Sequence, residues 1–233
     1  MDLSKNALGF RTAFFFGHPV QRPDKIFLNL SSSIPEFDAM PSIQPLPEGI
    51  QSDNFPIVRL RSESNIFHCE ISQSRIDFII RLEDKFESFN YNAIYSEYKR
   101  LSIELLKYLT TQTTIPVSRT GLVVSCFVGK DSPSLAVSLV EQCTGSSHDE
   151  DAIELSVRSN RRHFVNDVPC NDIRLFEVAQ IQSNGNRLGG VILERDINTA
   201  VINEVLAPEV LQAVVESSLD AHSLDNFTQA MTK

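Results

Sequence analysis

Residues 67–82, which read FHCEISQSRIDFIIRL, decide the fold. Apolar and polar residues alternate on both sides of the polar pair Gln73-Ser74. Period-two alternation with one polar side is typical of antiparallel strands that are wet on one face. Residues 58–61 (VRLR) show the same alternation. The sequence therefore predicts three successive strands in meander order.

The period changes in residues 91–112. Apolar side chains recur there at steps of four and three residues, which predicts a helix of about six turns with one apolar stripe. The stripe consists of Ile94, Tyr98, Leu101, Leu105 and Leu109. Residues 110–114 and Pro116 are expected to end this helix.

The C-terminal half repeats the order of strands followed by a helix. Strands are predicted at 122–128 and 153–157, with a tight connection at Ser159-Asn160 to a partner at 162–168. Asn184-Gly185 predicts a two-residue hairpin turn between 173–182 and 187–196, because both turn positions need positive φ. A final helical region is expected at 201–230, with Pro208 in its first turn.

These patterns predict an α+β fold, with mainly antiparallel sheet(s) and two long amphipathic helices, in which strands followed by a helix occur twice. Residues 1–56 are expected to hold one strand and a proline-rich, acidic connecting segment without regular structure. Residues 57–233 form the main domain, which is either one large curved sheet with both helices on its concave face or two half-units, 57–116 and 117–233.

The alternation also predicts which side chains are buried. Arg75, Asp77 and Arg81 should be solvated on the polar face. The residues expected to be nearly inaccessible are Phe67, Cys69, Ile76, Phe78, Ile80, Leu101, Leu105, Leu122 and Val124.

Composition excludes several classes of protein. The 233 residues carry a formal charge of −9, with 42% hydrophobic and 22% charged residues, which is a globular composition. No apolar run approaches the roughly 18–20 residues that cross a bilayer, and no secretory signal is seen, so we expect a cytoplasmic protein without membrane contact. The four cysteines contain no CxxC pair and are interpreted as buried apolar residues.

Motifs for known chemistry are missing from the sequence. It contains no GxxxxGK[ST], GxGxxG or GxSxG pattern and no Cys/His spacing suited to zinc, so we expect no cofactor and no metal. The acidic run at 149–151 is interpreted as a solvated loop. Arg158, Arg161 and Arg162 are candidates for binding an anion, although a solvated turn is the simpler interpretation. Direct nucleic-acid binding is not favoured, given the negative charge of the chain.

Asp196-Ile197-Asn198-Thr199 stands at the end of the last predicted strand, before the terminal helix. With the order of three strands, helix, strand, hairpins and helix, this motif resembles a sporadically distributed family of prokaryotic proteins that have no assigned activity. The resemblance implies no catalytic residues, and scattered occurrence suggests horizontally transferred defence or toxin–antitoxin genes. We expect Asp196, Asn198 and Thr199 to cap backbone amides where the strand ends.

Three functional hypotheses follow. The sequence leaves enzymatic activity open but favours a non-enzymatic binding or regulatory protein that acts on a protein partner through an acidic surface. The first alternative is an enzyme with a site built from scattered residues, for which Asp196, Asn198 and His222 are the candidates. The second is an acidic mimic of nucleic acid, which would need regularly spaced carboxylates on one face.

Overall fold

The computed structural model describes residues 1–27, 29–44, 55–82, 88–147, 152–183, 185–201 and 204–232. The strands are β1 (Ala7–Phe16), β2 (Ser42–Ile43), β3 (Val58–Arg61), β4 (Phe67–Ile71), β5 (Arg75–Arg81), β6 (Val117–Gly129), β7 (Ser156–Val165), β8 (Val168–Ser183) and β9 (Asn186–Thr199). The helices are α1 (Pro23–Phe27), α2 (Leu30–Ser33), α3 (Tyr91–Gln112), α4 (Pro133–Thr144), α5 (Pro208–Ala221) and α6 (Leu224–Met231).

The nine strands of the described residues all belong to one antiparallel sheet, with the order β2-β3-β4-β5-β1-β6-β9-β8-β7. The predicted α+β class with an antiparallel sheet is confirmed, and the strands of both halves of the chain share a single sheet. The N-terminal strand β1 lies at the centre of this sheet, where it pairs with β5 on one side and β6 on the other. β1 therefore joins the two halves of the chain.

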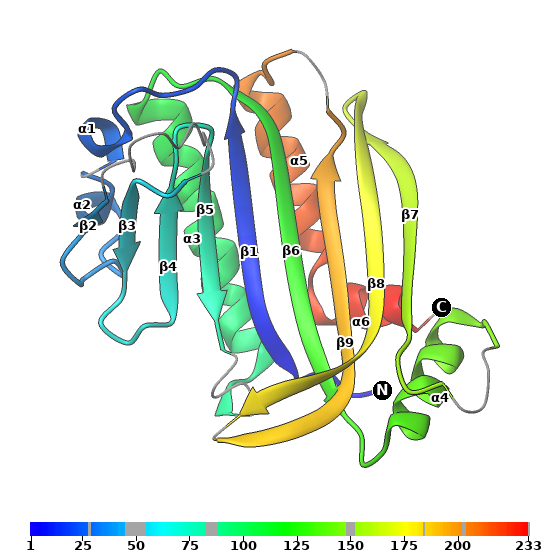
Figure 1. Ribbon diagram of the computed structural model, residues 1–233. Helices are drawn as coiled ribbons and strands as arrows, with labels where there is room; N and C mark the ends of the chain where they lie inside the picture. The colour runs from blue at the N-terminus through cyan, green and yellow to red at the C-terminus, as the bar shows by residue number, and fades with distance from the viewer. Residues whose placement is uncertain are drawn as a thin grey trace.

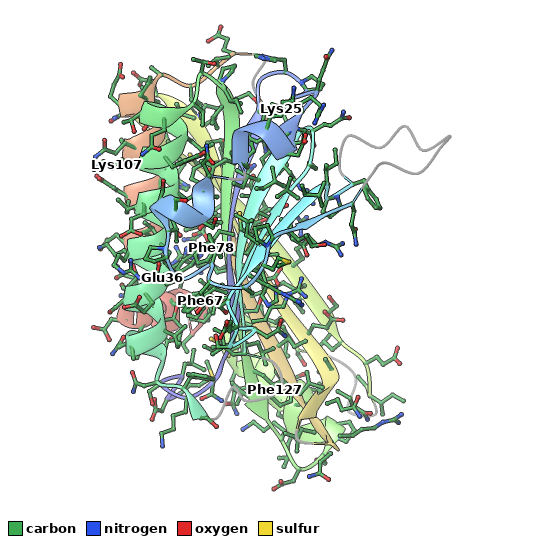
Figure 2. All side chains as sticks on the ribbon, turned by 90° about the vertical axis from the view of Figure 1, so that its left-hand side faces the viewer. Lys25, Glu36, Phe67, Phe78, Lys107 and Phe127 are labelled. Atoms are coloured by element: carbon green, nitrogen blue, oxygen red, sulfur yellow. The ribbon has the colours of Figure 1, made fainter. Side chains whose placement is uncertain are left out.

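Helices α3, α5 and α6 pack on one face of the sheet (Figure 1), and the edge-on view shows them together on one side of the strands (Figure 2). The buried alternate residues of the strands point to this face. Among them, Phe78 is only 1% exposed and contacts the rings of Phe37 and Tyr98. The predicted meander register is confirmed, because Cys69 pairs with Phe78 and Phe67 with Ile80.

Two residues differ from the predicted burial pattern. Phe67 is only partly buried, whereas the other eight predicted core residues are buried. Asp77 was expected to be solvated but is only 4% exposed. The arginines that surround this carboxylate explain its burial and are described below.

Helix α3 begins and ends at the predicted residues, 91 and 112. The Asn90 side chain caps its first turn by accepting hydrogen bonds from the amides of Asn92 and Ala93. On the sheet side, Tyr98 donates to the carbonyl oxygen of Arg11 at 2.9 Å, and Thr12 donates to the Tyr98 hydroxyl at 2.9 Å. These buried polar contacts fix α3 over the central strand.

Several local predictions were wrong. The segment 19–56 contains regular structure in α1, α2 and β2, because Phe27 and Leu30 supply side chains that are fully buried against the core. Helix α4 was not predicted. It begins at Pro133, a residue suited to the first position of a helix. The preceding residue, Ser132, caps the helix, because its side chain accepts a hydrogen bond from the amide of Leu135. The acidic run at 149–151 lies outside the described residues.

The predicted connection at Ser159-Asn160 was also wrong, because β7 runs through it. The chain turns instead at Asn166-Asp167, where both residues have positive φ (46° and 64°) between the paired Val165 and Val168. By contrast, the predicted hairpin between β8 and β9 is confirmed by the pairing of Ser183 with Asn186 and by Gly185 at φ 78°, while Asn184 lies outside the described residues.

The expected final helical region is divided into α5 and α6. The chain bends at His222 and Ser223, and the Tyr91 hydroxyl donates to the His222 carbonyl oxygen at 2.6 Å. Among the described helices, none is both long and apolar enough to cross a membrane.

Candidate functional site

The candidate site is the face of the sheet opposite α3 and α5, which we call the open face. Figure 1 looks directly onto it, and none of the described helices covers β5, β1 or β6 on this side. Strand register brings side chains from eight strands into one row across it. That row consists of Arg59, Glu70, Asp77, Ala13, Gly121, Asn198, Asn171 and Arg162.

Charge on the open face has the opposite sign to that of the whole chain. The alternate strand positions that point to it hold eight arginines and five carboxylates, a formal charge of +3, whereas the chain carries −9. None of the described strands contains a lysine. The arginines are Arg11, Arg59, Arg61, Arg75, Arg81, Arg119, Arg158 and Arg162, and the carboxylates are Glu70, Asp77, Glu177, Glu194 and Asp196.

Asp77 is the most deeply buried carboxylate of this face. Arg11 donates to its Oδ1 from Nε at 3.0 Å and from Nη2 at 2.7 Å, and Nε of Arg75 lies 2.8 Å from its Oδ2. A carboxylate between two guanidinium groups can be buried in its charged form. Asp77 in turn holds both arginines in fixed positions on the sheet.

Arginines also contact an aromatic ring. The guanidinium carbons of Arg75 and Arg119 lie 5.7 and 5.0 Å from the ring centroid of Phe15, at distances typical of cation–π contacts. Arg75, Phe15 and Arg119 are register neighbours on β5, β1 and β6. Near the end of β1, the open face therefore presents an aromatic ring between two cations.

A chain of amide hydrogen bonds crosses β8 and β9. Asn171 Nδ2 donates to Asn198 Oδ1 at 3.1 Å, and Asn198 Nδ2 donates to Asp196 Oδ1 at 2.9 Å. Asn160 on β7 donates to Asn171 Oδ1 at 3.4 Å. Burial raises the pKa of Asp196, and it outweighs the opposing effects of the Asn198 hydrogen bond and of nearby arginines.

The predicted capping of backbone amides holds for Thr199 but was wrong for Asp196 and Asn198, which hydrogen-bond to other side chains. All three lie within the strand β9 and not in a turn that follows it. Thr199 Oγ1 instead accepts the amide of Thr120 on β6 at 3.1 Å. Asp196 and Asn198 belong to the polar network of the open face.

A groove of about 500 Å³ lies on the open face above β1 and β6. Arg11 and Arg81 stand on one side of it, and Glu194 and Asp196 stand on the other. Its floor includes Gly9, at a β-bulge of β1 where a Cβ atom would come within 2.8 Å of the Ile80 carbonyl oxygen. In Figure 1, the turn end of the β8–β9 hairpin crosses in front of the lower ends of β1 and β6.

The three predicted anion-binding arginines do not form one cluster. Arg158 and Arg162 point to the open face from the edge strand β7, whereas Arg161 points to the opposite face. Arg162 Nη2 lies 3.5 Å from Asn171 Oδ1, so it extends the amide chain. The candidates for an enzyme site, Asp196, Asn198 and His222, do not come together either. His222 is fully buried on the helix-covered side, where its Nε2 lies 3.1 Å from the Arg195 carbonyl oxygen.

Of the four charged residues of the groove, the sequence analysis named Asp196 as a site candidate and missed Arg11, Arg81 and Glu194. Alternation placed Arg81 on the polar face of its own strand, but only the position of β1 between β5 and β6 brings Arg81 near Arg11 and the carboxylates of β9. All four cysteines are buried and unpaired in disulfides. Among the described residues, no group of three or more His, Cys, Asp or Glu side chains is placed to hold a metal ion.

The fold and its site define an α+β protein with a single antiparallel sheet, covered by helices on one face and bearing an arginine-rich network on the other. No protein-family model matches the chain, and no curated protein is significantly similar to it in sequence.

Proposed function

We propose that this chain is a non-enzymatic, cytoplasmic binding or regulatory protein that contacts a protein partner through its open face. The observation that supports the proposal is the type of positively charged residue on that face. Its positive side chains are all arginine, whereas the described lysines lie on helices and loops. Arginine is enriched and lysine depleted at the cores of protein–protein interfaces.

The arrangement of the arginines also suits binding. Arg11 and Arg75 are held in place by Asp77, whereas Arg59 and Arg81 are only loosely paired with Glu70, at 3.9 and 3.6 Å. Guanidinium groups that are already fixed lose less conformational entropy when a partner binds. The open face therefore offers a preorganised surface, unlike the acidic surface expected from the sequence.

The alternatives fit this geometry less well. An enzyme built on Asp196, Asn198 and His222 would need the three side chains in one pocket, but His222 lies on the other side of the sheet. A nucleic-acid mimic would need evenly spaced carboxylates, whereas arginines outnumber carboxylates on the open face. The defence or toxin–antitoxin context rests on the resemblance of the Asp196–Thr199 motif alone and is part of the proposal.

The test is affinity capture from the native host with charge-reversed variants. Arg81→Glu and Arg158→Glu change exposed arginines of the open face, and Arg161→Glu makes the same change on the other face of β7. We expect a partner that wild type and Arg161→Glu retain and that the two open-face variants lose. Retention of the same proteins by all four, with all variants folded by circular dichroism, would contradict the proposal.

A further inference from the structure

We propose that the groove over Gly9 recognises an extended segment of the partner protein that carries one acidic and one basic side chain on the same side. The inference deepens the proposed function, because it gives the chemistry of the partner at this site. It rests on the opposite charges of the two groove walls and on the register that places them.

Strand register connects the two walls by two parallel rows of residues that cross the strands. In the first row, Arg81 on β5, Gly9 on β1, Ser125 on β6 and Glu194 on β9 are successive neighbours. In the second row, Arg11 lies beside Val123, which lies beside Asp196. Each row thus has an arginine at one end and a carboxylate at the other, with small or apolar residues between them.

The dimensions of this arrangement suit a polypeptide. β1 and β9 are two strand spacings apart, about 10 Å, and the side chains of both walls extend over the floor. In an extended chain, residues two apart point to the same side and lie about 7 Å from each other. A segment that crosses the groove can therefore direct an acidic side chain to Arg11 and Arg81 while its basic side chain meets Glu194 and Asp196.

The wall charges also retain binding capacity. Arg81 is exposed, and its contact with Glu70 is a loose 3.6 Å. Glu194 accepts one hydrogen bond, from Ser125 at 2.8 Å, and Asp196 accepts one, from Asn198. A carboxylate can accept several hydrogen bonds, so both acidic residues can take further donors from a ligand.

The carboxylate wall distinguishes this ligand from a polyanion. Glu194 and Asp196 would repel a phosphate backbone or a purely acidic peptide that lay across the groove. The arginine wall would likewise repel a purely basic peptide. A segment with one acidic and one basic side chain can form an ion pair with each wall. Its net charge of zero also avoids repulsion by either wall.

The test uses fluorescein-labelled hexapeptides, with binding followed by fluorescence anisotropy at low ionic strength. One peptide carries glutamate and lysine two residues apart, and three matched peptides carry two glutamates, two lysines or two glutamines at the same positions. We expect wild type to bind the mixed peptide at least ten times more tightly than any other.

Charge reversal of either wall should change this preference in a defined direction. Glu194→Arg should favour the glutamate pair, Arg81→Glu should favour the lysine pair, and the double reversal should restore preference for the mixed peptide. Arg161→Glu on the opposite face should behave like wild type. Misfolding or loss of stability would weaken the binding of all peptides. It cannot shift the preference towards the glutamate pair in one variant and towards the lysine pair in the other.

The inference is overturned if all variants rank the peptides in the same order, if no peptide binds at millimolar concentration, or if a single-stranded oligonucleotide displaces the mixed peptide from wild type. Those results would leave the proposed function standing wherever partner capture still depends on Arg81 and Arg158. Capture that is unaffected by the open-face variants would instead remove the proposed function itself.

Discussion

Arg195 and Asp172 form a bidentate ion pair on the helix-covered side of the sheet, with Nε to Oδ1 at 2.9 Å and Nη2 to Oδ2 at 3.0 Å. Nη1 of the same arginine donates to the carbonyl oxygen of Ala221, at the end of α5. Burial alone would raise the pKa of Asp172, but the hydrogen bonds and charges of Arg195 and Arg174 lower it overall. The pair therefore ties β8 and β9 to the C-terminal helices.

Removing one partner of this pair should be costly. We expect Asp172→Ala to lower the free energy of unfolding by about 3–5 kcal/mol, because it leaves the buried Arg195 charge uncompensated. The double variant Asp172→Leu, Arg195→Met should lose less than the single one. Urea denaturation checks both, and a single variant as stable as wild type would show that the pair does not hold the helices.

A second prediction concerns the pH dependence of stability through His222. Burial and the nearby Arg195 charge lower the pKa of this imidazole to about 4. The unfolded chain binds a proton at His222 below about pH 6.5, whereas the folded chain does not, so its contribution to stability is full above that pH and is lost as the pH falls towards 4.

Between pH 6.5 and 5, His222 should therefore lower the free energy of unfolding by up to about 1.4 kcal/mol per pH unit. His222→Gln, which keeps a donor for the Arg195 carbonyl oxygen, should show a shallower decline over this interval. Parallel stability curves for wild type and His222→Gln would contradict the assignment.

Asp196 should have the opposite effect. Its pKa is raised by burial, so its contribution favours the folded state at low pH and is lost as the pH rises through the folded-state pKa. Asp196→Asn should therefore increase stability at pH 7 and give no gain below about pH 3, where the carboxyl group is protonated in both states. Denaturant midpoints at the two pH values test this, and a destabilised variant at pH 7 would refute it.

The two faces of β5 provide a matched packing test. Phe78→Ala removes a buried ring between the sheet and α3 and should cost about 3–5 kcal/mol of unfolding free energy. Ile79→Ala, on the neighbouring but half-buried position of the open face, should cost markedly less. Equal losses in urea denaturation would mean that the open face is packed like the core.

Much of the sheet could be predicted because local alternation determines it. Phe67–Leu82 alternates so regularly that a shift by one residue would expose its core face, and the Asn184-Gly185 turn has few other conformations available. The central position of β1 could not be predicted in this way. Its pairing with β5 and β6 joins residues at least 60 positions apart in the sequence and depends on tertiary packing.

The candidate site depends on the same long-range pairing. Arg81 and Glu194 are separated by more than 100 residues, and only the insertion of β1 beside β6 makes them ends of one row. The burial of Asp77 follows from Arg11 on β1, which no local pattern links to it. Conversely, the Arg158–Arg162 cluster was found from its sequence, although the strand period divides it between two faces.

The central claim is that the open face binds the partner, and arginine footprinting tests it most directly. The complex with the captured partner would be treated with phenylglyoxal, and modification of each arginine followed by mass spectrometry. We predict that the partner protects Arg81 and Arg158 but leaves Arg22, beside α1, as reactive as in the free protein. Protection of Arg22 with unchanged modification of Arg81 and Arg158 would contradict the account.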